Sequence, residues 1–372
     1  MMRKIFKSFL ILFVFCLSFT LCGTFTFSTD NAYADAATII KLANATDDTK
    51  GVKGFADYVN GYAAANVNDN LILTEDIVLT TDLTNTIGTA AAPFAGTFNG
   101  RGYKILNATV DLSGTSSDNQ YLGIFGYVQG SSTKRATIKN LSISGNLTLK
   151  AANPISLFAG GFAGFAKCAF FENVQLNANV VANFSNDFNL TFGNMIGQMV
   201  DSEINGAICR PTAVSVFEID NTDAKFYSLG GVVGEQNNSQ IFFAVVNETI
   251  KVDIAPEFIG DLNVGGISGK ISQGGSKIIN VALENGYEIK GRETNLNLET
   301  TIKVGQIAGL VANPAPASNA ETRIMSLSYI HYADNKDVSL FGDLGGYKFV
   351  EQSTKDYITV STEVFGTEEY FS

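Results

Sequence analysis

Apolar and polar residues alternate along most of the chain with a period of two, in short runs separated by polar turns. One such run sets Ile138, Leu141, Ile143, Leu147 and Leu149 among Lys, Asn, Ser and Thr. Alternation of this kind indicates strands with one buried face, and strong helix formers are missing from these runs. The pattern therefore predicts an all-β protein made of many short strands.

A glycine-containing apolar segment recurs along the chain, and a polar turn and a second apolar segment follow it. The last glycines of these segments are Gly126, Gly164, Gly197, Gly234, Gly269 and Gly309. The steps between them are 38, 33, 37, 35 and 40 residues, a period typical of solenoids, propellers or module arrays. Two or three strands per repeat fit one coil, which buries its inward face only against neighbouring coils. We therefore predict an all-β parallel β-helix of about six repeats.

Two residue types inside the repeats have structural interpretations. Asn140, Asn173 and Asn280 stand at similar places in the second apolar segment, which predicts an internal ladder of side-chain amides. Cys168 and Cys209 are the only cysteines after residue 34 and could form a disulfide in an oxidising compartment. We favour two unpaired small apolar residues, because the cysteines fall at different phases of the repeat.

The region before the repeats has the pattern of an end cap. Residues 54–61 place Phe55, Tyr58 and Val59 on one helical face, with Gly61 as a stop, and residues 71–79 alternate as a strand. A short helix here would cover the terminal strand edges, which otherwise template aggregation. We predict an N-terminal cap over residues 35–92, β-helix repeats over residues 93–330 and a C-terminal cap over residues 331–372.

The first 34 residues have the pattern of a secretory signal. Three basic residues precede an apolar run at residues 9–21, and Ala-Tyr-Ala at residues 32–34 supplies small side chains before the cut. The alternative is an uncleaved anchor, but the run is shorter than the roughly 20 residues that span a bilayer. We predict cleavage after Ala34 and a secreted product, either free or associated with the cell surface.

The net charge of the chain limits the classes of binding partner that we expect. Removal of residues 1–34 takes away three basic residues and Asp30, which leaves 22 Lys+Arg against 35 Asp+Glu, about −13 at pH 7. Nucleic acids and anionic membranes attract positive surfaces, so we expect neither as a partner, nor stable membrane insertion after cleavage.

Residues 93–105, Pro-Phe-Ala-Gly-Thr-Phe-Asn-Gly-Arg-Gly-Tyr-Lys-Ile, closely resemble the entry segment of bacterial GLUG-repeat proteins. In that family a helix and a Leu-rich strand come first, and Gly-Gly-x-x-Gly repeats then follow a β-helix. The repeats at 160–164, 230–234 and 265–269 carry this pattern, whereas Asn194 and Gln306 replace its second glycine. The resemblance covers roughly residues 50–330. It implies a secreted or surface, adhesin-like scaffold or binding region without catalytic residues of its own.

The reactive residues of the sequence exclude several kinds of catalytic and metal-binding site. The chain has one histidine, His331, so a zinc site with two histidines is excluded. There is no Gly-x-Ser-x-Gly nucleophile elbow and no Walker loop, and we interpret His331 as a packed or surface residue.

Carboxylates remain for catalysis. Glycosidases need two of them about 5 to 9.5 Å apart across a groove. Glu218 and Asp220 lie two apart, so on a strand they would share a face, and Asp223 follows them. We favour a solvated turn here, since Asn-Thr-Asp at 221–223 is turn chemistry. A Ca²⁺ site built from such oxygens stays an alternative that no known loop spacing selects, and we expect no cofactor.

Aromatic residues offer a different kind of site, because their faces can stack on sugars. The sequence has no Trp, but Tyr58, Tyr62, Tyr103, Tyr121 and Tyr127 gather early in the chain. The phenylalanines fall mostly at inward phases, as at Phe125, Phe162 and Phe192.

Two functions therefore stay open. The preferred one is a non-catalytic extracellular β-helix that binds a glycan or protein, or acts as a scaffold. The alternative is a polysaccharide hydrolase or lyase that uses Glu218 and Asp220. An enzyme would gather carboxylates with Lys or Arg on one sheet face across adjacent coils, whereas a binding protein needs only a polar or aromatic strip.

Overall fold

The computed structural model describes residues 39–312, with gaps at 116–117, 185–187, 213–214, 220–224, 248–249, 255–257, 274, 284–286, 292–300 and 306. Beyond residue 312 it describes three strands, at 322–329, 341–343 and 358–360. The predicted signal segment and His331 lie outside these residues. Within the described part, no helix combines the length and apolar character needed to cross a membrane.

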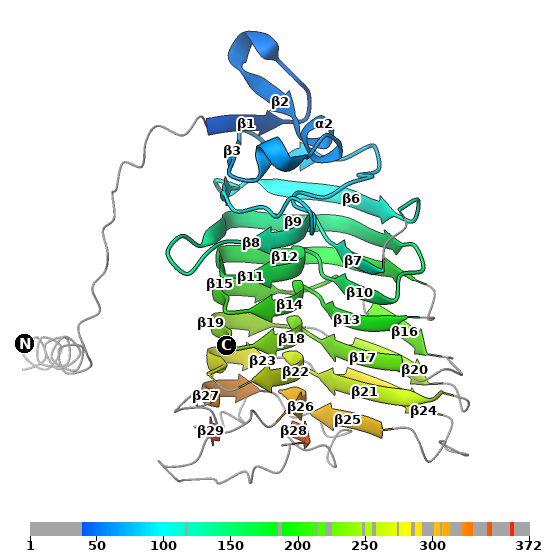
Figure 1. Cartoon of the computed structure of the whole chain (residues 1–372). Coiled ribbons are helices and arrows are strands. Elements are labelled where there is room, and N and C mark those ends of the chain that lie inside the picture. The colour runs from blue at the N-terminus through cyan, green and yellow to red at the C-terminus, as the bar shows by residue number, and fades with distance from the viewer. Residues whose placement is uncertain are drawn as a thin grey trace, which may run out of the picture. The chain divides into compact units, whose positions relative to one another are not determined.

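The predicted parallel β-helix is confirmed. Within each sheet, neighbouring strands pair in parallel from one coil to the next, and the coils stack along one axis (Figure 1). We number the four sheets 1 to 4. Sheet 1 is the longest, and its order is β2 (Val52–Gly54), β1 (Ile39–Ala43), β3 (Asn70–Leu73), β5 (Thr97–Asn99), β9 (Ala136–Ala151), β12 (Ala169–Asn183), β15 (Glu203–Cys209), β19 (Gln240–Val246), β23 (Lys277–Leu283), β27 (Thr322–Tyr329) and β29 (Ile358–Val360), with β4 (Ile77–Val78) and β6 (Lys104–Leu112) alongside.

Along each coil, sheets 2 and 3 follow sheet 1, and in three coils a strand of sheet 4 lies between sheets 1 and 2. Sheet 2 contains β7 (Asn119–Leu122), β10 (Ser156–Ala159), β13 (Asn189–Gly193), β17 (Lys225–Gly230), β21 (Gly260–Gly265) and β25 (Thr301–Gly305). Sheet 3 contains β8 (Phe125–Gln129), β11 (Ala163–Lys167), β14 (Ile196–Val200), β18 (Val233–Asn237), β22 (Ser268–Gln273), β26 (Ala308–Val311) and β28 (Phe341–Asp343). Sheet 4 contains β16 (Ser215–Ile219), β20 (Ile250–Ile254) and β24 (Tyr287–Gly291).

Inward side chains of all coils form one continuous apolar core. Phe125, Phe162 and Phe192 are fully buried in it, as the sequence predicts. Because successive residues of a strand point to opposite faces, each short strand contributes one or two inward residues and presents the others to solvent. The outward residues are therefore free to differ from coil to coil.

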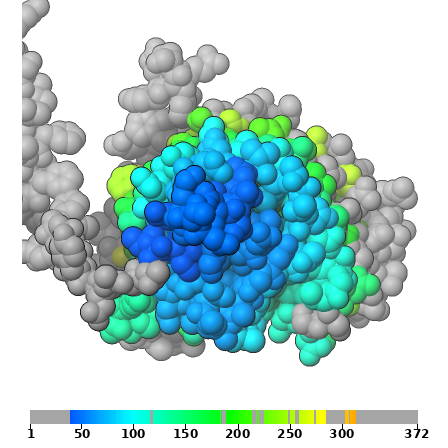
Figure 2. All heavy atoms as spheres, turned by 90° about the horizontal axis from the view of Figure 1, so that it is seen from above, coloured from blue at the N-terminus to red at the C-terminus, as the bar shows by residue number. Residues whose placement is uncertain are grey.

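The predicted capping helix is also present. Helix α2 (Phe55–Asn60) buries Phe55, Tyr58 and Val59, and Gly61 ends it. The 3₁₀ turns η1 (Asp48–Lys50) and η2 (Ala64–Asn66) flank this helix. Seen along the axis, these N-terminal residues cover the end of the coils (Figure 2). In the predicted C-terminal cap, the described residues are β28 and β29, which extend sheets 3 and 1.

The asparagine ladder differs from the prediction in two respects. Asn173 Nδ2 donates to Asn140 Oδ1 over 2.9 Å, but this pair is on the surface and not inside. Asn280 does not continue this pair, because Gly206 and Phe243 occupy the same register position in the two coils that lie between Asn173 and Asn280. These asparagines have positive φ, near 50°. We therefore interpret them as the residues that let the backbone turn at a corner, since Asn and Gly adopt this left-handed conformation more readily than other residues.

The ladder inside the coils is made of serine. The Ser202 amide donates to Ser239 Oγ over 3.0 Å, and the Ser239 amide donates to Ser276 Oγ over 3.3 Å. All three side chains are buried. The two cysteines form no disulfide, as we favour from the sequence, and Cys209 is buried whereas Cys168 is only half-buried.

Candidate functional site

Sheets 2 and 3 meet at the glycine-containing segment of each repeat, and the corner between them is concave. Tyr121 on β7 and Tyr127 on β8 both point outward, yet their ring centroids lie only 4.8 Å apart. Outward side chains of adjoining sheets converge in this way only when the sheets fold toward each other on the solvent side. The strands of the two sheets meet along a line that runs down the solenoid (Figure 1). We call this line the crease.

The last glycine of the motif produces the crease. A Cβ at Gly164 would lie 2.5 Å from the Leu122 nitrogen and 2.7 Å from the Phe158 oxygen. At Gly269 a Cβ would meet the Leu229 nitrogen at 2.5 Å. Real Cβ atoms do not approach backbone atoms so closely, so only glycine lets a strand of sheet 3 press against sheet 2. The repeat motif therefore encodes the shape of this surface.

Four aromatic rings fill the first two coils of the crease, and we call them the aromatic cluster: Tyr121, Tyr127, Phe158 and Phe165. Tyr121 stacks on Phe158 with centroids 5.3 Å apart, and Tyr127 stacks on Phe165 at 4.5 Å. All four side chains are half-buried. Burial raises the pKa of both tyrosines, so their phenols stay protonated. Neither hydroxyl has a hydrogen-bond partner among the described residues, which leaves both available to a ligand.

The coils below the aromatic cluster line the crease with polar side chains. Register places Thr191, Ser228 and Asn263 below Phe158 on sheet 2, and Gln198, Glu235 and Lys270 below Phe165 on sheet 3. Ser228 Oγ donates to the Gly234 oxygen over 2.9 Å, and Lys270 Nζ lies 3.5 Å from Glu235 Oε1. We call these six residues the polar half of the crease. Over these coils the crease is thus a continuous strip, aromatic at one end and polar below it, and Lys303 and Leu310 follow in the next coil.

The tyrosines that the sequence singles out separate into different places. Tyr121 and Tyr127 come together in the crease, whereas Tyr58 and Tyr62 are buried in the cap. Phe158 and Phe165 were assigned to no site by the sequence reasoning. The repeat itself holds the signal, because these residues follow Tyr121 and Tyr127 by 37 and 38 residues, about one coil.

The carboxylate candidates are only partly placed. Glu218 lies on β16, and Asp220 lies outside the described residues. Register pairs Glu218 with Asp253 on β20, and Asp253 with Lys290 on β24. A row of two acidic residues and one lysine therefore crosses sheet 4. Within the described residues, no group of three His, Cys, Asp or Glu could hold a metal ion.

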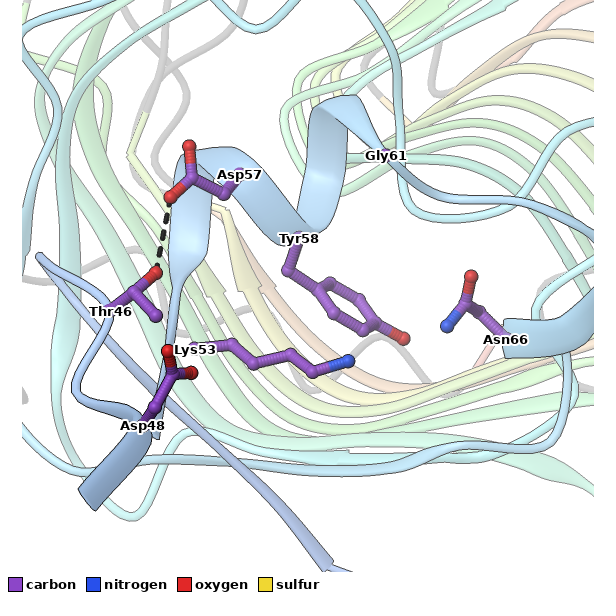
Figure 3. Close-up of a pocket in the computed structure, with 7 residues that line it drawn as sticks. All are labelled: Thr46, Asp48, Lys53, Asp57, Tyr58, Gly61 and Asn66. Atoms are coloured by element: carbon purple, nitrogen blue, oxygen red, sulfur yellow. Dashed lines mark hydrogen bonds between the residues drawn. The ribbon is translucent and has the colours of Figure 1, made fainter. Parts of the chain in front are cut away.

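The cap contains a shallow pocket of about 410 Å³ beside α2 (Figure 3). Its lining includes Asp48, Lys53, Asp57, Tyr58 and Asn66. The Tyr58 hydroxyl and Asn66 Nδ2 both donate to Asp69 Oδ2, over 2.8 and 2.9 Å. Burial, with the nearby Asp69 carboxylate, raises the pKa of Tyr58, so the phenol remains a donor. These bonds hold the cap together, so we interpret the pocket as part of the covering of the solenoid end.

No family model, curated protein or solved structure matches the chain significantly. Function must therefore be argued from the geometry of the crease and of sheet 4.

Proposed function

We propose that this protein is an exported, non-catalytic binding module of the adhesin-like or scaffold type, and that it binds a glycan in the crease. The observation that carries the proposal is the aromatic cluster, four half-exposed rings in a concave surface with two tyrosine hydroxyls free for hydrogen bonding. The export pattern of residues 1–34 and the resemblance to GLUG-repeat proteins support the extracellular setting by analogy.

Ligand sites commonly combine apolar and aromatic walls with a few fixed polar groups. The cluster supplies the apolar wall, and its hydroxyls supply donors at the same place. A sugar has the matching surface, since its ring presents C–H groups on its faces and hydroxyls at its edge. The rings also stack on one another, so their orientation is fixed before a ligand arrives and little side-chain entropy is lost on binding.

Affinity electrophoresis of the chain from Asp35 onward, through gels that contain cell-wall and plant polysaccharides, tests this proposal. We expect retardation in at least one gel, without clearing of the polysaccharide, and loss of retardation in Tyr127→Ala and Phe165→Ala. Phe243→Asn is the matched control, because Phe243 is an exposed ring, 59% accessible, on sheet 1. Unchanged migration of the wild-type protein in every gel would reject a glycan ligand and leave a protein partner.

A polysaccharide hydrolase or lyase is the second candidate, and the row of Glu218, Asp253 and Lys290 across sheet 4 favours it. Such an enzyme would release new reducing ends from a polysaccharide in the gels. Glu218→Gln and Asp220→Asn would abolish that release while leaving the far-UV circular dichroism unchanged. Release that survives both substitutions would assign the activity to other residues.

A further inference from the structure

We propose that the crease binds a linear, electrically neutral glycan along the solenoid axis, and that Asn263 in the polar half recognises a hydroxyl of the chain. This inference rests on the proposed function and names the ligand class and a second subsite. Asn263 lies four strand steps from Tyr121 in the same outward column of sheet 2.

Asn263 is an unusual residue for an outward position. Its side chain is only 6% exposed, and its Oδ1 atom is buried without a hydrogen-bond partner in the structure. A buried polar atom without a partner destabilises the protein, and native structures keep few of them. In the coil above, the corresponding Ser228 satisfies its hydroxyl by donating to the Gly234 oxygen. Asn263 therefore has hydrogen-bonding capacity that the protein does not use.

The position of Asn263 connects this unused capacity to the crease. Inward Leu262 and Val264 flank it, so by alternation Asn263 points to the solvent side of β21. A Cβ at Gly309 would lie 2.9 Å from the Asn263 carbonyl carbon, so the next strand of sheet 3 presses close beside this residue. Asn263 thus lies at the bottom of the crease, and its Oδ1 atom, which is buried in the structure, meets a ligand hydroxyl once the side chain turns outward.

The spacing favours a chain over a single sugar. Neighbouring strands lie about 4.8 Å apart, so four steps place Asn263 roughly 19 Å from the start of the aromatic cluster. A disaccharide cannot reach from one to the other. A longer linear chain can stack at the aromatic end and donate a hydroxyl at Asn263.

The charges favour a neutral chain. Glu235 and Lys270, on the facing wall of the crease, form an ion pair and so cancel each other. Lys303 follows Asn263 in the same column of sheet 2 and adds one positive charge beside it. The whole chain carries a net charge of −11, which repels acidic polysaccharides over long range. A neutral, hydroxyl-rich chain does not meet this repulsion.

Isothermal titration of the chain from Asp35 onward with cellohexaose, xylohexaose and mannohexaose, and with the matching disaccharides, tests the inference. We expect at least one hexasaccharide to bind, and Asn263→Leu to weaken that binding about tenfold, since one hydrogen bond to a buried group is lost. We expect the same substitution to raise Tm by about 2 °C, because the unpaired buried amide is removed. Asn263→Ala serves as a second variant should leucine not fit.

Tyr62→Phe is the matched control, since Tyr62 also has a buried hydroxyl without a partner but lies in the cap. It should raise Tm as well and leave hexasaccharide binding unchanged. Full affinity in Asn263→Leu, together with lost affinity in Tyr127→Ala, would overturn the subsite while the proposed function stands. Absence of binding by the wild-type protein to every oligosaccharide and polysaccharide would overturn both. Equal affinity for disaccharide and hexasaccharide would overturn the extended chain.

Discussion

The two coils that carry the aromatic cluster and the coils below them share one backbone but stabilise their corners differently. In the upper coils the crease is filled by rings, and the interior corner positions are Ala136 and Ala169. In the lower coils the crease is polar, and register places Ser202 and Ser239 at the same interior positions. The upper coils therefore fill the crease with packed rings, whereas the lower coils carry the serine hydroxyls, the first of which also accepts from the Ala169 amide over 3.0 Å.

This difference shows which parts of a coil are fixed and which are free. Inward apolar residues and the last glycine of the motif recur in both regions, because they determine the core and the crease. The outward columns carry no such constraint, so each coil can present a different surface. A ligand site can therefore be built on a few coils without altering the fold, which is the property that repeat proteins use for binding.

The largest expected effect comes from the glycines that both regions share. Gly164→Ala in the upper coils and Gly269→Ala in the lower coils should each lower the free energy of unfolding by about 3 kcal/mol, because the new Cβ would overlap backbone atoms. Urea denaturation followed by circular dichroism measures this. Gly114→Ala is the control, since a Cβ there meets nothing within 4 Å. Equal stability of Gly164→Ala and Gly114→Ala would contradict our account of the crease.

The next largest effect on stability should differ between the coils of the aromatic cluster and the coils below them. Phe165→Ala should cost about 2 kcal/mol of unfolding free energy, because it removes a half-buried ring and its stacking on Tyr127. Gln198→Ala, at the register-matched position one coil below, should cost less than about 0.5 kcal/mol. Thermal denaturation of both variants measures the contrast. Similar losses at the two positions would show that the cluster adds no packing energy beyond that of an ordinary surface residue.

The serine ladder provides the opposite contrast. Ser239→Ala should cost about 1.5 kcal/mol, because Ser239 Oγ accepts from the Ser202 amide and its loss leaves that buried donor unpaired. Hydrogen exchange should also reveal faster exchange of the Ser202 amide in this variant. A variant as stable as the wild type, with the amide still protected, would mean that another acceptor replaces the hydroxyl.

Ion pairs on the surface should contribute least to the thermal stability of the protein. Hydrogen bonds from Ser113 and from Lys150, 3.0 Å away, hold the pKa of Asp111 below its ordinary value. A lowered carboxyl pKa stabilises the fold above the ordinary value near 4, and this contribution disappears as the pH falls through the lowered pKa. Lys150→Met should therefore lower Tm by no more than about 1 °C at pH 7, and by less at pH 2. Thermal scans at both pH values measure this, and a larger loss at pH 2 would contradict the sign.

The candidate site could be predicted only in part. The sequence places Tyr121 and Tyr127 in a group of five early tyrosines and does not separate them from Tyr58 and Tyr62, which are buried in the cap. The convergence of the first two tyrosines with Phe158 and Phe165 depends on the angle at which sheets 2 and 3 meet, and a strand pattern does not encode this angle. The serine ladder was missed for a related reason, since an isolated serine in a turn is ordinary turn chemistry until the coils are aligned.

By itself the sequence determined the parallel β-helix, its inward residues and its capping helix, because periodicity and glycine spacing are local properties of the chain. The tertiary structure alone decided what the outward residues do. It placed Tyr127 on Phe165, Glu235 beside Lys270, and Asn263 deep in a concave strip. These contacts join residues about one coil or more apart, so they exist only once stacking sets the register and the glycines fold sheet 3 against sheet 2.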